Sequence, residues 1–107
     1  MPVESQRIYV GSIDCSKLSR FLSFDASPYS VATFEAAPQF NASLGSWVCK
    51  IQTAILGAPV DFPIAIQFTS SILRVADKDM TGTEKVFFTN TTVGTSGLVD
   101  IWAICKS

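Results

Sequence analysis

The sequence predicts an all-β protein: a single antiparallel β-sandwich of jelly-roll type with about six to eight strands. Three observations support this prediction. Apolar and polar residues alternate with a period of two in several short segments. Gly and Pro turn signals separate these segments about every 8 to 14 residues. The chain has 107 residues, of which 48% are hydrophobic, enough for one core. A small barrel is the alternative, and residues 1–107 are expected to form one domain or a fragment of a larger chain.

The clearest alternation lies between Trp47 and Val75. In its first half one face collects Trp47, Cys49, Ile51, Thr53 and Ile55. In its second half one face collects Ile64, Ile66 and Phe68. The intervening residues 57–63 (GAPVDFP) contain Gly and Pro and predict a loop. We therefore expect two strands around a loop, placed at the centre of a sheet.

The residues before this pair predict two further strands and one ambiguous segment. Residues 7–13 predict a first strand, because they combine aromatic and β-branched side chains. Residues 15–24 fit both one short helical turn and a second strand, and both remain open. Residues 29–36 predict a strand that Pro38 ends, because proline cannot donate a hydrogen bond to a sheet. A loop is expected over residues 38–46.

The residues after the pair predict two more strands. The apolar positions change phase near Ser70 and Ser71, which predicts a β-bulge or a bend. Residues 76–83 are polar and predict a loop or hairpin, and residues 84–92 predict a strand followed by a turn over 91–97. The last strand, residues 98–105, is apolar on both faces. Such a strand lies between two layers, or has one face against another subunit.

Composition excludes several classes of function. Only 16% of the residues are charged and the net charge is −1, whereas about 25% charged is usual. We therefore expect a protein partner, either another copy or a larger protein shell, to cover apolar surface. No basic run indicates direct contact with nucleic acid. No apolar run is long enough for a membrane helix, so membrane insertion is not expected. The N-terminus lacks the apolar core of a signal peptide, which predicts a cytoplasmic protein unless the chain is part of a virion.

Catalytic chemistry is not expected. The sequence has no histidine, so triads of serine or cysteine with histidine are impossible within this chain. The glycines form neither a dinucleotide-binding motif nor a phosphate-binding loop. We therefore expect a protein that is not an enzyme and that has no cofactor.

A metal site is a weak possibility at one polar hairpin. Asp77, Asp79 and Glu84 lie close together in sequence, and carboxylates are ligands for hard cations. Lysines interrupt the acids and no calcium-loop pattern is present, so a solvated hairpin is the favoured interpretation. Three cysteines, an odd number, exclude complete pairing into disulfides. Cys49 and Cys105 lie in apolar strands and are expected to be small buried side chains, with a single disulfide as the alternative, so whether Cys15, Cys49 and Cys105 are all free stays open.

The interface candidates come from two apolar segments. Adjacent Phe87 and Phe88 must point to opposite faces of a strand, so one of them should meet a second layer, a partner or solvent. The final strand adds Leu98, Trp102 and Ile104 on one face. Aromatic side chains also allow a stacking platform for sugars or bases, but core packing is the default for aromatic residues within strands.

These observations favour a non-enzymatic structural or assembly protein. Low charge, a Ser- and Thr-rich composition and the strand pattern resemble those of viral coat β-sandwiches. We expect a viral capsid subunit, a protruding capsid domain or a capsid-decorating protein, acting as a homo-oligomer or within a larger shell through protein–protein contacts. The alternative is a β-sandwich module that binds carbohydrate or a protein ligand, with a glycan or a receptor as its partner.

Overall fold

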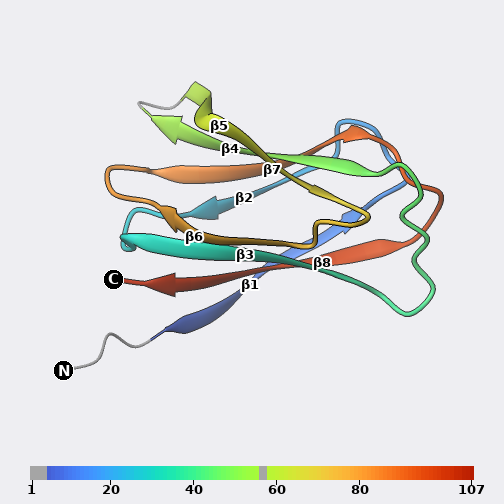
Figure 1. Cartoon of the computed structure of the whole chain (residues 1–107), viewed down its shortest axis with the longest axis horizontal. Coiled ribbons are helices and arrows are strands. Elements are labelled where there is room, and N and C mark those ends of the chain that lie inside the picture. The colour runs from blue at the N-terminus through green and yellow to red at the C-terminus, as the bar shows by residue number, and fades with distance from the viewer. Residues whose placement is uncertain (1–4, 56–57) are drawn as a thin grey trace.

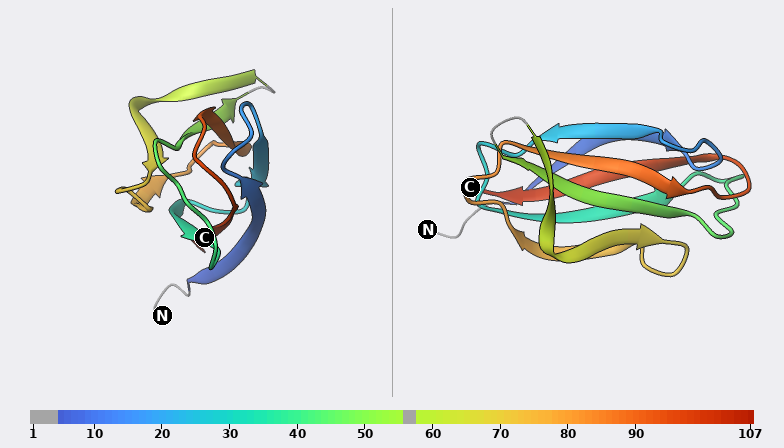
Figure 2. Two further views of the ribbon diagram at one scale, coloured as in Figure 1. Left: turned by 90° about the vertical axis from the view of Figure 1, so that its right-hand side faces the viewer. Right: turned by 90° about the horizontal axis from the view of Figure 1, so that it is seen from above.

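In a computed structural model, two antiparallel sheets pack face to face with their strands running along the long dimension of the molecule (Figures 1 and 2). The structure describes residues 5–55 and 58–107, and it describes the side chains of all of these except residues 54, 55 and 58–65. Within these residues the chain forms eight strands in two four-stranded sheets. No helix in the described residues has the length and apolar character to cross a membrane.

The strands of the two sheets follow one another in a fixed spatial order. Sheet A contains, in order, β1 (Gln6–Asp14), β8 (Leu98–Lys106), β3 (Val31–Pro38) and β6 (Arg74–Asp79). Sheet B contains, in order, β2 (Phe21–Asp25), β7 (Lys85–Thr92), β4 (Val48–Ile55) and β5 (Ala58–Thr69). Every connection except β4–β5 crosses from one sheet to the other. The predicted all-β sandwich is confirmed, and this strand order is compatible with the jelly-roll type, which stays a prediction.

The core lies between the sheets and is built around aromatic rings. Phe88 of β7 meets Phe34 of β3 edge to face at 5.2 Å between ring centroids, and stacks against Phe68 of β5 at 6.1 Å. Trp47 stacks against the other side of this group through Phe68, at 6.2 Å. All four side chains are fully buried. The alternation seen in the sequence is therefore explained by strands that each bury one face between two sheets.

The structure corrects the position of the predicted central pair and decides between the two alternatives at Ser70 and Ser71. β4 has neighbours on both sides, but β5 is an edge strand, so the pair is not the centre of the sheet. Of the two alternatives at Ser70 and Ser71, the bend is correct and the bulge is not, because β5 ends at Thr69, the chain bends at these two serines, and β6 begins at Arg74 in the other sheet. The irregular register lies earlier in β5, where the partner of β4 changes from Ile66 to Asp61.

Loop boundaries also differ from the sequence prediction. The loop expected over residues 57–63 is strand from Ala58 onward, and residues 56–57 lie outside the described residues. The loop expected over residues 76–83 is shorter, because β6 continues to Asp79 and pairs with β3. Of the two alternatives for residues 15–24, the strand is correct over Phe21–Asp25. In each case pairing with a neighbouring strand imposes structure that local composition does not predict.

Cys49 and Cys105 are buried, as expected, and all three cysteines are free, so the alternative of a single disulfide is not realised. Burial raises the pKa of the Cys49 thiol to about 12 and that of Cys105 to about 11. An unfolded cysteine ionises near pH 8.5. Because the pKa is raised in the folded protein, the thiols contribute stability below the unfolded pKa, and this contribution is lost as the pH rises toward the folded pKa.

We therefore expect the free energy of unfolding to fall between about pH 9 and pH 11, and to fall less steeply in Cys49→Ala. Denaturant titrations at several pH values, in the presence of a reductant, measure both slopes. The comparison concerns the slope with pH, since the loss of the sulfur atom lowers stability at every pH. If stability fell with pH equally steeply in the two proteins, the raised pKa of the Cys49 thiol would not be the source of the pH dependence.

Candidate interaction surface

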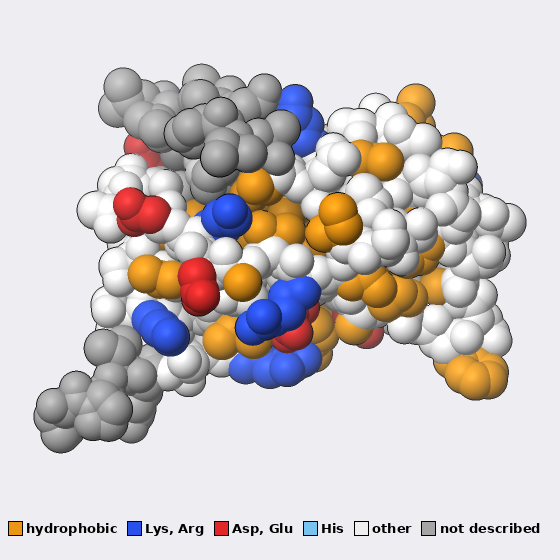
Figure 3. Space-filling view, in the orientation of Figure 1, with side chains coloured by type: hydrophobic (Ala, Val, Ile, Leu, Met, Phe, Trp, Pro, Cys, Tyr) orange, Lys and Arg blue, Asp and Glu red, His pale blue; other side chains and the backbone are white. Residues whose placement is uncertain are grey.

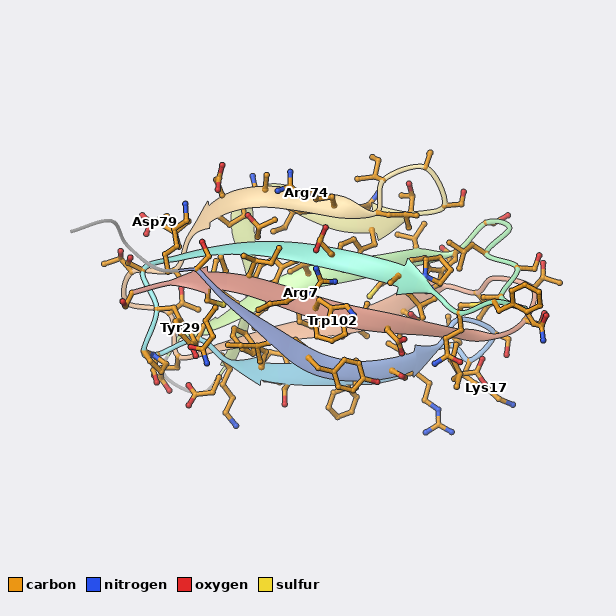
Figure 4. All side chains as sticks on the ribbon, turned by 90° about the horizontal axis from the view of Figure 1, so that it is seen from below. Arg7, Lys17, Tyr29, Arg74, Asp79 and Trp102 are labelled. Atoms are coloured by element: carbon orange, nitrogen blue, oxygen red, sulfur yellow. The ribbon has the colours of Figure 1, made fainter. Side chains whose placement is uncertain are left out.

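The outer face of sheet A carries a row of large side chains across all four of its strands. The strand register places Tyr9 of β1 opposite Trp102 of β8, Trp102 opposite Glu35 of β3, and Glu35 opposite Arg74 of β6. Trp102 points outward because its odd-numbered neighbours in β8 face the core. Figure 4 shows Arg7, Trp102 and Arg74 on this face. We name the set of Arg7, Tyr9, Glu35, Arg74, Asp100 and Trp102 the Trp102 surface.

Aromatic and cationic groups are stacked at the middle of this surface. The Arg7 guanidinium lies over the Trp102 ring, with its carbon 4.6 Å from the ring centroid. The Tyr9 ring lies 5.0 Å from Trp102 at an interplanar angle of 54°. Both contacts are attractive, since a cation interacts with the ring face and tilted aromatic pairs are favourable. They hold Trp102 in place and cover one side of its ring, while Tyr9 remains 51% exposed.

A basic group lies on one side of Trp102. Glu35 forms ion pairs with Arg7 at 3.6 Å and with Arg74 at 3.7 Å. Two guanidinium groups share one carboxylate, so this group retains a net positive charge. The arginine side chains are 58% and 60% exposed, and such exposed ion pairs are weak. The arginines are therefore available to a partner at little cost. Figure 3 shows Lys and Arg side chains beside Asp, Glu and hydrophobic side chains along the lower part of the molecule.

An acidic group lies along the same strand, two residues before Trp102. Asp100 accepts hydrogen bonds from Ser12, from Gln39 at 3.1 Å and from Tyr9 at 3.3 Å. The hydrogen bonds from Ser12, Gln39 and Tyr9 lower the pKa of Asp100. The carboxylate is therefore ionised at neutral pH, and neutral donors hold it without cancelling its charge. Around its aromatic rings the Trp102 surface therefore carries two guanidinium groups, Arg7 and Arg74, and two carboxylates, Glu35 and Asp100.

The predicted interface residues fall into three places. Leu98, Trp102 and Ile104 all lie on the outer face of sheet A, and Leu98 is 40% exposed. Phe87 is half-buried on the outer face of sheet B. Phe88 is a core residue rather than an interface residue, because it packs between Phe34 and Phe68. The sandwich itself therefore supplies the second layer that the Phe87–Phe88 pair requires.

The three acids of the weak metal candidate are not brought together. The backbone N–H of Asp77 donates to Thr33 Oγ1 at 3.0 Å. The Asp79 carboxylate accepts the backbone N–H of Thr81 at 2.9 Å, and the hydrogen bonds from Thr81 lower its pKa. In the part of the chain that the structure describes, no three His, Cys, Asp or Glu side chains group as metal ligands would. Asp79 thus serves as a turn-forming residue.

Sequence reasoning missed most polar members of the Trp102 surface, and it also missed an exposed apolar tip. The side chain of Phe40, in the β3–β4 loop, is 99% exposed. The sequence predicted a loop in this segment but did not indicate an exposed aromatic side chain at its tip. The polar members lie far apart in sequence, on strands whose pairing the sequence does not specify. The one signal was the alternation in residues 98–105, which placed Trp102 and Ile104 on a common face.

A hollow of about 420 Å³ opens beside the arginine end of this surface, where the edge strands β5 and β6 face each other across the sandwich. Its described polar lining consists of Gln67, Arg74 and Lys78. Isoleucine side chains at positions 66 and 72 supply apolar surface. This lining suits a polar or anionic segment of a partner better than hydrolytic chemistry, since amide and cationic groups bind but do not form an acid–base pair.

Comparisons with known proteins support the fold. No protein-family model matches this chain, and no curated protein matches it in sequence. Among solved structures, the chain is similar to the crystal structure of the SPBc2 prophage-derived protein YomS, with a TM-score of 0.72 and 17% sequence identity. The match covers 100% of this chain and 96% of that chain. The class of protein that the fold and the surface define is a β-sandwich domain with aromatic and charged side chains on one outer sheet face.

The position of Trp102 predicts a small effect of its removal on the isolated chain. Because Trp102 is half-buried on an outer face, we expect Trp102→Ala to lower the free energy of unfolding by about 1 kcal/mol. The 3–5 kcal/mol typical of a buried tryptophan would apply only if the ring were in the core. Denaturant unfolding at low protein concentration measures this value. Trp47→Ala is the matched truncation of the fully buried tryptophan, and a loss in Trp102→Ala as large as that in Trp47→Ala would contradict the placement of Trp102 on an outer face.

Proposed function

We propose that this chain is a non-enzymatic, phage-related structural protein that assembles into a virus particle through protein–protein contacts of the Trp102 surface. The observation that carries the proposal is the preorganised group of Tyr9, Trp102 and Arg7 on an open sheet face. Tyrosine, tryptophan and arginine are the residues that most often dominate binding energy at protein interfaces. The proposal includes no catalytic activity, since the sequence has no histidine.

The similarity to a prophage-derived protein supports a phage origin. The neighbour's title names its source only, and at 17% identity the likeness concerns the fold. Many unrelated functions share the β-sandwich, so the fold alone carries no functional assignment. The support comes from the combination of this neighbour with a low content of charged residues and an exposed aromatic surface. A capsid subunit, a protruding capsid domain and a capsid-decorating protein are the specific forms of the proposal.

The carbohydrate-binding alternative is less favoured by the geometry. A sugar platform needs a free aromatic face, and Arg7 covers one face of Trp102. The Tyr9 and Trp102 rings are also inclined by 54°, so they do not form one flat platform. A protein partner binds an aromatic ring flanked by charged groups more readily than a sugar does, because the side chains of a protein adapt to an uneven surface.

The experiment that tests the proposal is the location of the chain in its natural source. Phage particles are purified from that source and examined by quantitative mass spectrometry and by electron microscopy with an antibody against the chain. We expect the chain in particles at a fixed number of copies, with label on the capsid surface for a decorating or protruding form. Its absence from intact particles, with the chain present in the lysate, would contradict the proposal.

A further inference from the structure

We propose that the hollow between β5 and β6 binds an extended acidic segment of a partner protein, which pairs with the free edge of β6 and places a carboxylate against Lys78. The site is additional to the Trp102 contacts of the proposed function. β5 and β6 are each the last strand of their sheet, and the hollow of about 420 Å³ lies between them. On the opposite side β1 and β2 close the sandwich, since a Cβ at Gly11 would lie 3.1 Å from Leu22 Cδ2.

The free edge of β6 presents backbone groups to the hollow. The backbone N–H of Ala36 in β3 donates to the backbone oxygen of Leu73 at 2.9 Å, so Leu73 faces β3. Because successive residues of a strand direct their backbone groups to opposite sides, Arg74 and Ala76 direct their N–H and C=O groups away from β3. Both residues line the hollow. A second extended chain can therefore pair with them, as in other complexes in which a peptide adds to a sheet edge.

The length of this free edge favours a short segment as the occupant. Asp77 has a φ of 50°, and its backbone N–H donates to Thr33 Oγ1 at 3.0 Å. The register between β3 and β6 shifts at the same place. Such a bulge turns the edge and interrupts pairing with another strand. Pairing is therefore limited to residues 74–76, which suits a peptide segment better than edge-to-edge pairing with the sheet of a second copy.

Lys78 supplies a cation that has no partner. It lies opposite the fully buried Ala32 in the β3–β6 register, so its half-buried side chain is on the inner face of sheet A. Among the described residues Lys78 forms neither an ion pair nor a side-chain hydrogen bond. Lysine is seldom buried without a partner of opposite charge. The Lys78 ammonium group at the hollow is therefore matched to a carboxylate from outside the chain.

The other lining side chains match the same kind of ligand. The Nε atom of Arg74 lies 3.7 Å from Glu35, which is longer than a hydrogen bond, so the guanidinium retains donors for a second carboxylate. Isoleucines at positions 66 and 72 offer apolar surface, and no described lining residue is acidic. Figure 3 shows hydrophobic side chains beside Lys and Arg side chains in the middle of this face. The lining is thus complementary to a segment in which acidic and aliphatic side chains alternate.

The test uses a pool of blocked peptides with the sequence Gly-X-Asp-X-Asp-X-Gly, where X is Val, Ile or Leu. A second pool with Lys in place of Asp is the basic counterpart. Two-dimensional NMR of the labelled chain should show shifts of the Arg74, Ala76 and Lys78 amide signals with the acidic pool. Hydrogen exchange of the Arg74 and Ala76 amides should slow, because they become hydrogen-bonded. No binding of the acidic pool at about 1 mM, or shifts confined to other strands, would overturn the inference.

Charge reversal at Lys78 tests the role of the ammonium group. Lys78→Glu should weaken binding of the acidic pool by about tenfold or more, the value of one hydrogen bond to a charged group. It should also bind the basic pool more tightly than the natural chain does, and this gain cannot come from misfolded protein. Lys78→Met keeps the apolar stem and should bind both pools alike. Lys17→Glu, an equal change of charge on the β1–β2 loop away from Arg74 (Figure 4), should bind as the natural chain does.

Further outcomes distinguish the ligand and separate this inference from the proposed function. Equal binding of the two pools by the natural chain, or unchanged binding of the acidic pool by Lys78→Glu, would overturn it. Sodium acetate that bound as tightly as the acidic pool would also overturn it, because the site would then hold a small anion and no peptide segment. Trp102→Ala should leave peptide binding unchanged. The presence of the chain in purified particles still decides the proposed function independently.

Discussion

Phe88→Ala should lower the free energy of unfolding by about 3–5 kcal/mol. Phe88 is fully buried between the sheets, where its ring contacts Phe34 at 5.2 Å and Phe68 at 6.1 Å. Truncation removes both ring contacts and leaves a cavity between the sheets. The surrounding side chains are fixed on two different sheets and cannot move in to fill it. Because a domain of this size is stable by only about 5–15 kcal/mol, the variant should be largely unfolded in mild denaturant. Equilibrium denaturation followed by tryptophan fluorescence measures the change.

Phe87→Ala is the matched control, because it removes the same ring from the adjacent residue of the same strand. Phe87 is half-buried on the outer face of sheet B, so its truncation leaves no enclosed cavity. We expect a loss of about 1 kcal/mol or less. Equal losses at the two positions would mean that the side chains of β7 do not alternate between core and surface as the structure places them.

The same pair of residues shows what the sequence predicts well. A period of two identifies which positions of a strand share a face, and the buried positions Cys49, Ile51, Val99 and Ile101 follow that period. When both faces of a strand are apolar, the period of two does not determine which face lies in the core. For β8 and for Phe87 and Phe88, that choice depends on the strands on either side, and their order is a property of the whole fold.

The Trp102 surface illustrates the limit more sharply. Arg7, Glu35, Arg74 and Asp100 belong to four strands, and no sequence spacing connects them. Their proximity follows from the order β1-β8-β3-β6, in which the first and last strands of the chain are neighbours. A prediction of six to eight strands is compatible with many strand orders. It therefore identified Trp102 and Ile104, which share one strand, but could not identify the charged residues that neighbouring strands place beside them.

Asn90 is the second position at which a single change should be severe. Its side chain accepts a hydrogen bond from Trp47 Nε1 at 2.7 Å, and its Nδ2 donates to the backbone oxygens of Asp14 at 2.8 Å and of Lys17 at 3.0 Å. It therefore joins β7 to the buried tryptophan and to the connection between β1 and β2. Asn90 is only 1% exposed, so water has little access to replace these bonds.

We expect Asn90→Ala to lower the free energy of unfolding by about 3–5 kcal/mol, since each buried polar group left without a partner costs about 1–3 kcal/mol. Chemical denaturation measures this change, and loss of the fluorescence signal of Trp47 reports on the local environment. Asn41→Ala is the matched control, because Asn41 is an exposed asparagine in the β3–β4 loop. It should change the stability by less than about 0.5 kcal/mol.

Asn90→Asp separates the loss of hydrogen bonds from the loss of volume. An aspartate has the shape of asparagine and accepts the Trp47 hydrogen bond, but its carboxylate faces the two backbone oxygens that Nδ2 contacts in the natural protein. Burial and these oxygens should raise the pKa of the introduced carboxyl group. A raised pKa in the folded state means that the acid is best tolerated below its unfolded pKa, near 4, and that stability is lost as the pH rises through the folded pKa. The deficit of Asn90→Asp relative to the natural protein should therefore shrink in acid, whereas that of Asn90→Ala should not. If the two deficits changed in parallel with pH, the hydrogen bonds from Asn90 to the connection between β1 and β2 would not be the source of its stabilising effect.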